Sequence, residues 1–318
     1  MNDLKRIIFL GSPEFAIPSL TKLIESEQFK PLAVITQPDR PSGRSKCPQP
    51  TPVKVMALEH KIPVYQPEDI NSDDFLNILQ SLRPDLLVTV AYGQKLKKAM
   101  RNSAVFGAVN LHPSLLPELR GAAPIPFTLW QGSIQTGITI FKLVSRMDAG
   151  PIYFSKPLFI FPDENATFLT DRLARIGAQF LLQFLTDFFD NPWEPIPQDE
   201  GKATYCRKLD KEDGIIDWNQ PAKEIQNHIR ALSVSPGAYT FFRGLQLKIL
   251  AAEIRERNSS LPPGSIVSVL KNMGFIVQTA DKELLIMHVQ PSGKKEMSAW
   301  AFHLGAKLET GERLEQNA

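Results

Sequence analysis

The sequence is poor in cysteine, in closely spaced metal ligands and in long apolar runs. Its two cysteines, Cys47 and Cys206, are too few for a disulfide framework or a cysteine-rich zinc site. Its five histidines show no metal-ligand spacing, so we predict no metal. No apolar run approaches the ~20 residues that a membrane-spanning helix needs. The short run at residues 7–10 lacks a cleavage site, and no arginine-rich leader precedes it. We therefore expect a cytoplasmic protein that does not engage a membrane.

The first predicted β–α turn is also poor in glycine. A dinucleotide fingerprint would place G-x-G-x-x-G at this point. The turn reads GSPEF at residues 11–15 and holds one glycine, and Pro13 removes a backbone amide that could face a phosphate. This argues against NAD or NADP, although the order of elements resembles half of a Rossmann fold. The simpler interpretation of Gly11 is a tight turn.

What the sequence does contain is typical of a globular chain of about two domains. It has 318 residues, of which 43% are hydrophobic and 22% are charged. Residues 1–200 are nearly balanced, with 20 Lys and Arg against 21 Asp and Glu, whereas residues 201–308 carry 15 against 10. A basic second half permits an anionic partner such as nucleic acid, although a solvated surface would also explain it.

Strands and helices alternate through the first 190 residues. The strand candidates are continuous apolar runs, which is typical of a parallel sheet covered on both faces. Strands are predicted at residues 5–10, 32–36, 64–65, 85–90, 108–111 and 138–144. Helices are predicted from about residue 13, after the N-cap Thr51 to about residue 60, at 72–82 with Asn71 as the cap, and at 167–189.

The composition changes near residue 191. Residues 191–197 read NPWEPIP, and a polar stretch follows. A helix is predicted at 221–232, and then short strands separated by Gly and Pro turns, at 238–242, 247–254, 265–270, 275–279 and 284–289. Many short strands with turns suggest a small barrel. We therefore predict a domain at 1–190, a linker at 191–207 and a second domain at 208–318.

Asn110 and His112 lie at the carboxyl end of a predicted central strand, where open α/β sheets bind ligands. Residues i and i+2 share one face of a strand, and Pro113 keeps His112 extended. An amide and an imidazole aimed at one point suit a developing oxyanion. The alternative, a strand-end amide and a structural histidine, has equal weight from spacing alone.

Asp148, in the run MDAG at 147–150, follows another predicted strand and could orient His112. By spacing alone a turn residue is the more common role. Ser114 lies beside His112, but no G-x-S-x-G elbow surrounds it, so a serine hydrolase is not indicated.

A polar, proline-rich loop at 37–50 holds Arg40, Arg44 and Lys46 against Asp39. Long loops of this kind are often functional, and basic side chains on them suit phosphate contacts. A solvated surface loop is an equally good explanation. The pair Lys294 and Lys295 is read by default as part of a turn between barrel strands.

Taken together, these segments resemble the methionyl-tRNA formyltransferases. The resemblance is carried by GSPEFA at 11–16, TQPDRPSGR at 36–44, TPVK at 51–54, NLHPSLLPELRGAAPI at 110–125, MDAG at 147–150 and QPSGKKEMSA at 290–299. The run at 110–125 is specific for folate-dependent formyltransferases in general. The PDRPSGR loop and the carboxyl-terminal match narrow the resemblance to the tRNA enzymes.

The resemblance implies a Rossmann-like formyltransferase domain followed by a small OB-like β-barrel that binds tRNA. It implies transfer of a formyl group from 10-formyltetrahydrofolate to the α-amino group of methionine on initiator tRNA, by a monomer. By motif position it assigns catalysis to Asn110, His112 and Asp148. Residues Ser114, Leu115, Leu116 and Pro117 would contact the folate, and Arg40, Arg44 and Lys46 the tRNA. Ser235 stands where members of the family often carry an aromatic residue.

Two other functions share parts of this pattern. A formyltransferase acting on a small amine, such as an amino sugar nucleotide, would use the same residues between 110 and 150. The basic second half and the PDRPSGR loop argue against it. A tRNA-binding module without catalysis is disfavoured because Asn110, His112 and Asp148 are all present.

Overall fold

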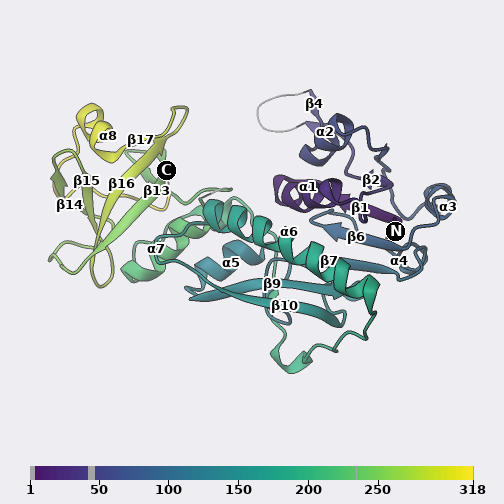
Figure 1. The fold of residues 1–318 in the computed structure, drawn as a ribbon. Helices are drawn as coiled ribbons and strands as arrows, with labels where there is room; N and C mark the ends of the chain where they lie inside the picture. Colours follow the sequence, from purple (N-terminus) through teal and green to yellow (C-terminus); the bar gives the residue numbers. More distant parts are fainter. Residues whose placement is uncertain (1–3, 42–46, 234, 318) are drawn as a thin grey trace. The chain divides into compact units, whose positions relative to one another are not determined.

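The computed structural model describes residues 4–41, 47–233 and 235–317, which fold as two compact units (Figure 1). Unit 1 comprises residues 1–121, 135–159 and 170–206, and unit 2 comprises residues 122–134, 160–169 and 207–318. Residues 191–206, predicted to form a linker, are therefore part of unit 1. Among the described helices, none combines the length and apolarity needed to cross a membrane.

A mostly parallel sheet forms the centre of unit 1, in the strand order β10-β9-β7-β6-β1-β2-β5. The strands are β1 (Ile7–Gly11), β2 (Ala33–Ile35), β5 (Val64–Tyr65), β6 (Leu86–Val90), β7 (Ala108–His112), β9 (Gln135–Lys142) and β10 (Ile152–Phe159). The first five are parallel, as the apolar runs predicted, whereas β9 pairs antiparallel with β7 and β10 antiparallel with β9.

Helices cover both faces of this sheet, which explains why its central strands are mostly apolar. The helices of unit 1 are α1 (Ile17–Glu25), α2 (Pro52–Glu59), α3 (Asp73–Ser81), α4 (Lys98–Arg101) and most of α6 (Ala166–Asp190). Alternate residues of β1 separate the two faces: Ile7 and Phe9 pack with α1, α2 and α6, whereas Ile8 and Leu10 pack with α3 and α4. In Figure 1, α6 runs along the sheet above β7 and β9.

The structure changes three local predictions. The cap of α3 is Ser72, whose hydroxyl accepts from the amide of Phe75, and not Asn71, which instead donates to the carbonyl of Lys95. Strand β10 was not predicted, because its burial follows no alternation and Pro157 lies within it. Helix α5 (Pro124–Trp130) was not predicted either, because two prolines in seven residues argue against a helix.

Unit 2 is a small antiparallel barrel with helices beside it. Its elements are α5, α7 (Ala222–Ala231), β12 (Tyr239–Phe242), β13 (Leu245–Arg255), β14 (Ile266–Leu270), β15 (Gly274–Gln278), β16 (Glu283–Pro291), β17 (Met297–Ser298) and α8 (Ala299–Ala306). The strand order is β12-β13-β16-β15-β14. Residues 311–315 close the open edge, because Glu312 accepts from the amide of Ile266 on β14 and Glu315 exchanges hydrogen bonds with Phe241 on β12. Closure leaves few unpaired strand edges.

Candidate active site

The candidate site lies at the carboxyl edge of the parallel strands in unit 1. The chain places β2 and β5 on one side of β1 and then returns to place β6 and β7 on the other. This reversal of strand order, between β1 and β6, is where open α/β sheets bind ligands. Asn110 is the third and His112 the last residue of β7, which pairs with β6. The fold therefore brings both side chains to the carboxyl end of the sheet.

The side chain of Asn110 is oriented by the neighbouring strand. Thr89 on β6 stands directly opposite Asn110 in the parallel ladder. Its hydroxyl lies 2.7 Å from Asn110 Oδ1 and 2.8 Å from the carbonyl oxygen of Val109. Because Oδ1 faces Thr89, the amide nitrogen of Asn110 is directed away from it. The half-buried amide is thus held by a partner that the sequence did not single out.

His112 is buried, with 5% of its surface exposed, and both of its ring nitrogens have neighbours. Nε2 lies 3.0 Å from the carbonyl oxygen of Leu119, and Nδ1 lies 3.9 Å from Oδ2 of Asp148. A carbonyl can only accept, so the Nε2 position carries a proton. Nδ1 is therefore the nitrogen that faces Asp148.

Asp148 reaches His112 from a loop, residues 143–151, that joins β9 to β10. Asp148 has a left-handed backbone, with φ of 47°, and its Oδ2 accepts from the amide of Gly121 at 2.8 Å. Gly150 follows because no larger residue fits: a Cβ there would lie 1.6 Å from the carbonyl oxygen of Lys142. The motif MDAG therefore combines a turn with a carboxylate whose Oδ2 lies 3.9 Å from His112 Nδ1.

Residues 114–117, expected to face the folate, form a tight turn after β7. Ser114 is buried and its hydroxyl donates to the carbonyl of Glu118 at 2.7 Å. Thr139 on β9 donates to the carbonyl of Ser114 at 2.7 Å and accepts from the amide of Leu116 at 3.2 Å. Leu115 packs over β9 at Gly137, where a Cβ would come within 2.4 Å of the leucine side chain. Ser114 is thus bound to the backbone, which agrees with the argument against a serine hydrolase.

Arg120 is the largest fully buried side chain, and its place next to the site was missed by the sequence analysis. Its guanidinium donates to Gln198 and Glu200 and contacts the hydroxyl of Tyr205. The Arg120 guanidinium lowers the pKa of Glu200 below its usual value, and Arg146 adds to this effect. Glu200 is therefore ionised at neutral pH. The partners lie about 80 residues apart, so no local pattern could have paired them.

The basic loop is only partly described. Arg40 begins β3 (Arg40–Pro41), which pairs with β4 (Pro48–Gln49), and its guanidinium forms an exposed ion pair with Glu68. Asp39 accepts from Lys54 at 2.6 Å and from Gln66 at 2.7 Å. Arg44 and Lys46 lie outside the described residues.

Gly11 serves close packing at the end of β1. A Cβ there would lie 2.8 Å from the ring of Phe9 and 2.9 Å from the side chain of Ala16. Gly11 is the last residue of β1, so close packing and not a turn accounts for the glycine. Among residues 4–41, 47–233 and 235–317, no cluster of three or more His, Cys, Asp or Glu side chains is arranged to hold a metal ion.

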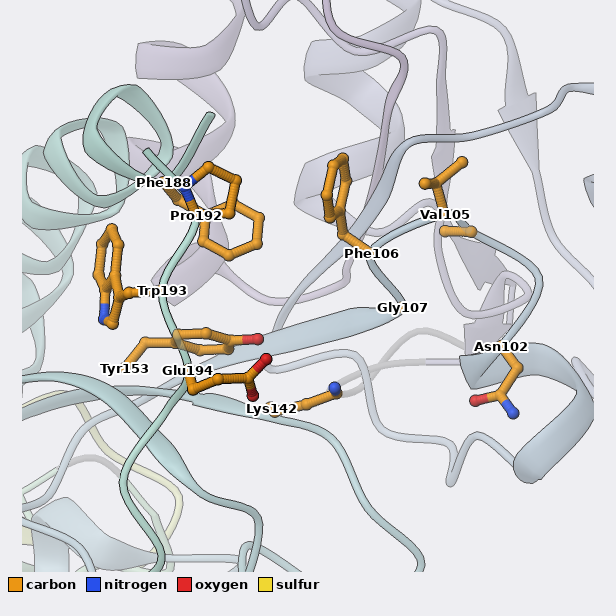
Figure 2. A pocket seen from close by; sticks show the side chains of 11 residues that line it. Asn102, Val105, Phe106, Gly107, Lys142, Tyr153, Phe188, Pro192, Trp193 and Glu194 are labelled. Carbon is orange, nitrogen blue, oxygen red and sulfur yellow. The ribbon is translucent and has the colours of Figure 1, made fainter. Parts of the chain in front are cut away.

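A separate cavity of about 460 Å³ lies at the other end of β7. Gly107, which precedes β7, lines it, whereas His112 ends the strand about 16 Å farther along at ~3.3 Å per residue. Figure 2 shows Tyr153 and Trp193 on one side, with the carboxylate of Glu194 beside the Tyr153 hydroxyl and Lys142 below. One acidic and one basic side chain on the rim give it no net charge preference.

The sequence matches known protein families over most of its length. Residues 5–185 match the family "Formyl transferase", and residues 208–307 match "Formyl transferase, C-terminal domain". A methionyl-tRNA formyltransferase of Roseiflexus castenholzii is 42% identical over 310 residues, which cover 97% of this chain and 98% of that protein.

The chain belongs to the methionyl-tRNA formyltransferase family.

Two solved structures share the fold of this chain. The sugar 3N-formyltransferase WlaRD, solved in the presence of dTDP and 5-N-formyl-THF, superposes with a TM-score of 0.67 at 17% identity, over 92% of this chain and 99% of that one. HypX from Aquifex aeolicus, in complex with tetrahydrofolic acid, gives a TM-score of 0.62 at 17% identity. That match covers 94% of this chain and 46% of HypX. The predicted fold, a Rossmann-like domain followed by a barrel, is confirmed.

Replacing Gly150 with alanine should displace the loop that carries Asp148, because the new methyl group would overlap the Lys142 carbonyl. Overpacking of this kind costs about 1–3 kcal/mol. We expect a lower midpoint in urea unfolding and faster amide exchange in residues 143–151. The matched control is Gly305→Ala in α8, where no atom lies within 4 Å of the added carbon. Equal midpoints for the two variants would contradict this account of MDAG.

Proposed function

We propose that this protein transfers a formyl group from 10-formyltetrahydrofolate to the α-amino group of methionine on initiator tRNA. Family membership supports a folate-dependent formyl transfer. The observation that carries the chemistry is the meeting of Asn110, His112 and Asp148 at the carboxyl edge of β7, with His112 Nδ1 3.9 Å from the Asp148 carboxylate. Because the reaction needs charged tRNA, we place the enzyme in the cytoplasm. We further propose that it acts as a monomer.

The difficult step in this reaction is the tetrahedral intermediate. The attacking amine is neutral in part at physiological pH, since α-amino groups titrate near ~8 and esterification lowers that value. When the amine nitrogen bonds to the formyl carbon, the formyl oxygen becomes negative. We propose that the amide nitrogen of Asn110, directed away from Thr89, donates to this oxygen. His112 donates from Nδ1, since Nε2 is occupied by Leu119.

Collapse of the intermediate requires one proton transfer. The bond between the formyl carbon and N10 of the folate breaks, N10 gains a proton, and the product amide nitrogen loses one. The imidazole can donate from Nδ1 while Nε2 donates to Leu119 only when both ring nitrogens carry a proton, and the carboxylate of Asp148 lies 3.9 Å from Nδ1. We propose that His112, or water held by Asp148, moves the proton between the two nitrogens. This step uses only groups of this chain and the two substrates.

The two substrates would approach from different segments. Ser114, Leu115, Leu116 and Pro117 would contact the folate, supported by the rigid turn that Thr139 holds. The loop at 37–50 and the basic part of unit 2 would contact tRNA phosphates. Arg40 forms an exposed ion pair with Glu68, so a phosphate would have to displace that carboxylate to bind it.

The substrate assignment is tested with purified full-length protein. We expect formylation of methionyl-tRNA from 10-formyltetrahydrofolate, measured as labelled formyl in acid-precipitable tRNA, and none with uncharged tRNA. A dTDP-amino sugar serves as the competing amine. Turnover of the sugar without turnover of the charged tRNA would reassign the substrate, and binding of tRNA without turnover would reassign the protein to a binding module.

The two catalytic roles predict large effects on kcat. Asn110→Ala removes an oxyanion donor and should lower kcat about 100- to 1,000-fold. Asp148→Asn keeps the shape but removes the charge beside His112, and we expect a loss of about 100-fold or more. The matched controls are Asn102→Ala and Asp187→Asn, both exposed positions of unit 1. Wild-type kcat in either site variant would remove that residue from the mechanism.

The basic loop predicts an effect on tRNA recognition. Arg44→Ala should raise the KM for methionyl-tRNA and leave the KM for the folate unchanged, because only the tRNA carries the phosphate backbone. The slope of log kcat/KM against log salt should become shallower by about 1. Arg40→Ala is the internal comparison and should have the smaller effect, since Arg40 is paired with Glu68. An unchanged slope in Arg44→Ala would leave the loop without a role in binding.

A further inference from the structure

The segment after α6 fastens two parts of the candidate site together. We call residues 196–206 the clamp segment. At its start, Ile196 exchanges two backbone hydrogen bonds with Ile152, the first residue of β10. At its end, β11 (Tyr205–Cys206) pairs with β8 (Arg120–Gly121). The segment therefore runs from the strand that follows the Asp148 loop to the strand that follows the folate turn.

Gln198 is the side chain of the clamp segment that contacts the Asp148 loop. Its Nε2 donates to the carbonyl oxygens of Asp148 at 2.8 Å and Gly150 at 2.7 Å. Two acceptors two residues apart are thus tied to one amide nitrogen. The backbone of Asp148 is in the left-handed region, which is unfavourable for residues other than glycine. Such a conformation persists when contacts with the surrounding structure hold it.

Arg120, on the side of the Gln198 amide that faces away from the loop, fixes the orientation of this amide. Arg120 donates to Gln198 Oε1 from Nε at 3.0 Å and from Nη2 at 2.8 Å. A guanidinium has no acceptor, so only the oxygen of Gln198 can face it, and the nitrogen must face the loop. Arg120 is in turn held by the carboxylate of Glu200, at 2.9 Å. The contacts form one chain from Glu200 through Arg120 and Gln198 to the backbone of Asp148.

We propose that Gln198 is a positioning residue, which holds the Asp148 loop so that the carboxylate faces His112 during formyl transfer. Gln198 touches no reacting atom; it acts through the two carbonyls that flank the turn. The proposal rests on the proposed roles of Asp148 and His112 for its effect on catalysis. Its structural part, that Gln198 holds the loop, stands independently of them.

The variant Gln198→Glu keeps the side-chain oxygen that accepts from Arg120 and removes the nitrogen that donates to the Asp148 loop. The glutamate still accepts from Arg120, so the buried guanidinium keeps a partner. It cannot donate to the carbonyls of Asp148 and Gly150, and its second oxygen would instead face them. The matched control is Gln183→Glu on α6, where the amide donates to Asp187 on the exposed face of the helix.

Amide exchange measured by mass spectrometry tests the positioning without any assay of turnover. In Gln198→Glu we expect faster exchange in residues 143–151 and at Gly121, whose amide donates to Asp148. Gln183→Glu should match the wild type in these peptides. Unchanged exchange in Gln198→Glu would overturn the proposal, whatever reaction the protein catalyses. Faster exchange with no formyl transfer by the wild type would uphold the positioning and reject the proposed function.

Kinetics on the double variant test the coupling to Asp148. A displacement of about 1 Å in a catalytic group can cost about 100-fold, so Gln198→Glu should lower kcat by about that factor, with the KM for the folate unchanged. In the Asp148→Asn background the same change should cost less than about threefold, because the group that it positions is already lost. An equal loss in both backgrounds would show that Gln198 acts on something other than Asp148 and would overturn the proposal.

Discussion

The burial of Arg120 is the constraint on which the candidate site depends. A guanidinium removed from water is costly unless every N–H finds an acceptor. This chain supplies those acceptors from the segment beyond α6, as Gln198, Glu200 and the hydroxyl of Tyr205. That segment must therefore close onto the sheet. When the segment packs onto the sheet and supplies acceptors to Arg120, it also places Gln198 against the loop of Asp148. The same contacts therefore satisfy the buried charge and position the site.

The local features of the fold could be read from the sequence because they depend on neighbouring residues. Thr51 caps α2, as predicted, through its hydroxyl and the amide of Lys54. Runs of Ile, Leu and Val marked the central strands because these are buried on both faces. The prediction failed at β10, which contains Pro157, and at α5, whose two prolines both lie in its first turn, where proline is tolerated. Antiparallel pairing of β9 and β10 also has no local signature.

In the candidate site, too, the sequence indicated the residues whose positions depend on local structure and missed those that depend on long-range contacts. Asn110 and His112 could be placed on one face by the period of a strand, and the end of a central strand indicated a ligand edge. Asp148 could not be told from an ordinary turn residue, because its role is defined by a contact across 36 positions that only the fold creates. Arg120 and Gln198 gave no signal at all. Residues 191–207, whose composition predicted a linker, include the clamp segment, which pairs with β10 at Ile196 and with β8 at Tyr205 and Cys206.

The clamp segment also contacts the backbone next to His112. His112 Nε2 meets the carbonyl of Leu119, and the amide of the same Leu119 donates to the hydroxyl of Thr204 at 2.8 Å. Thr204 further accepts from the amide of Arg120 through its carbonyl. One end of the segment thus orients the proton on His112, and the other end holds the backbone of Asp148. The clamp segment therefore contacts the backbone beside both His112 and Asp148, two residues that lie 36 positions apart in the sequence.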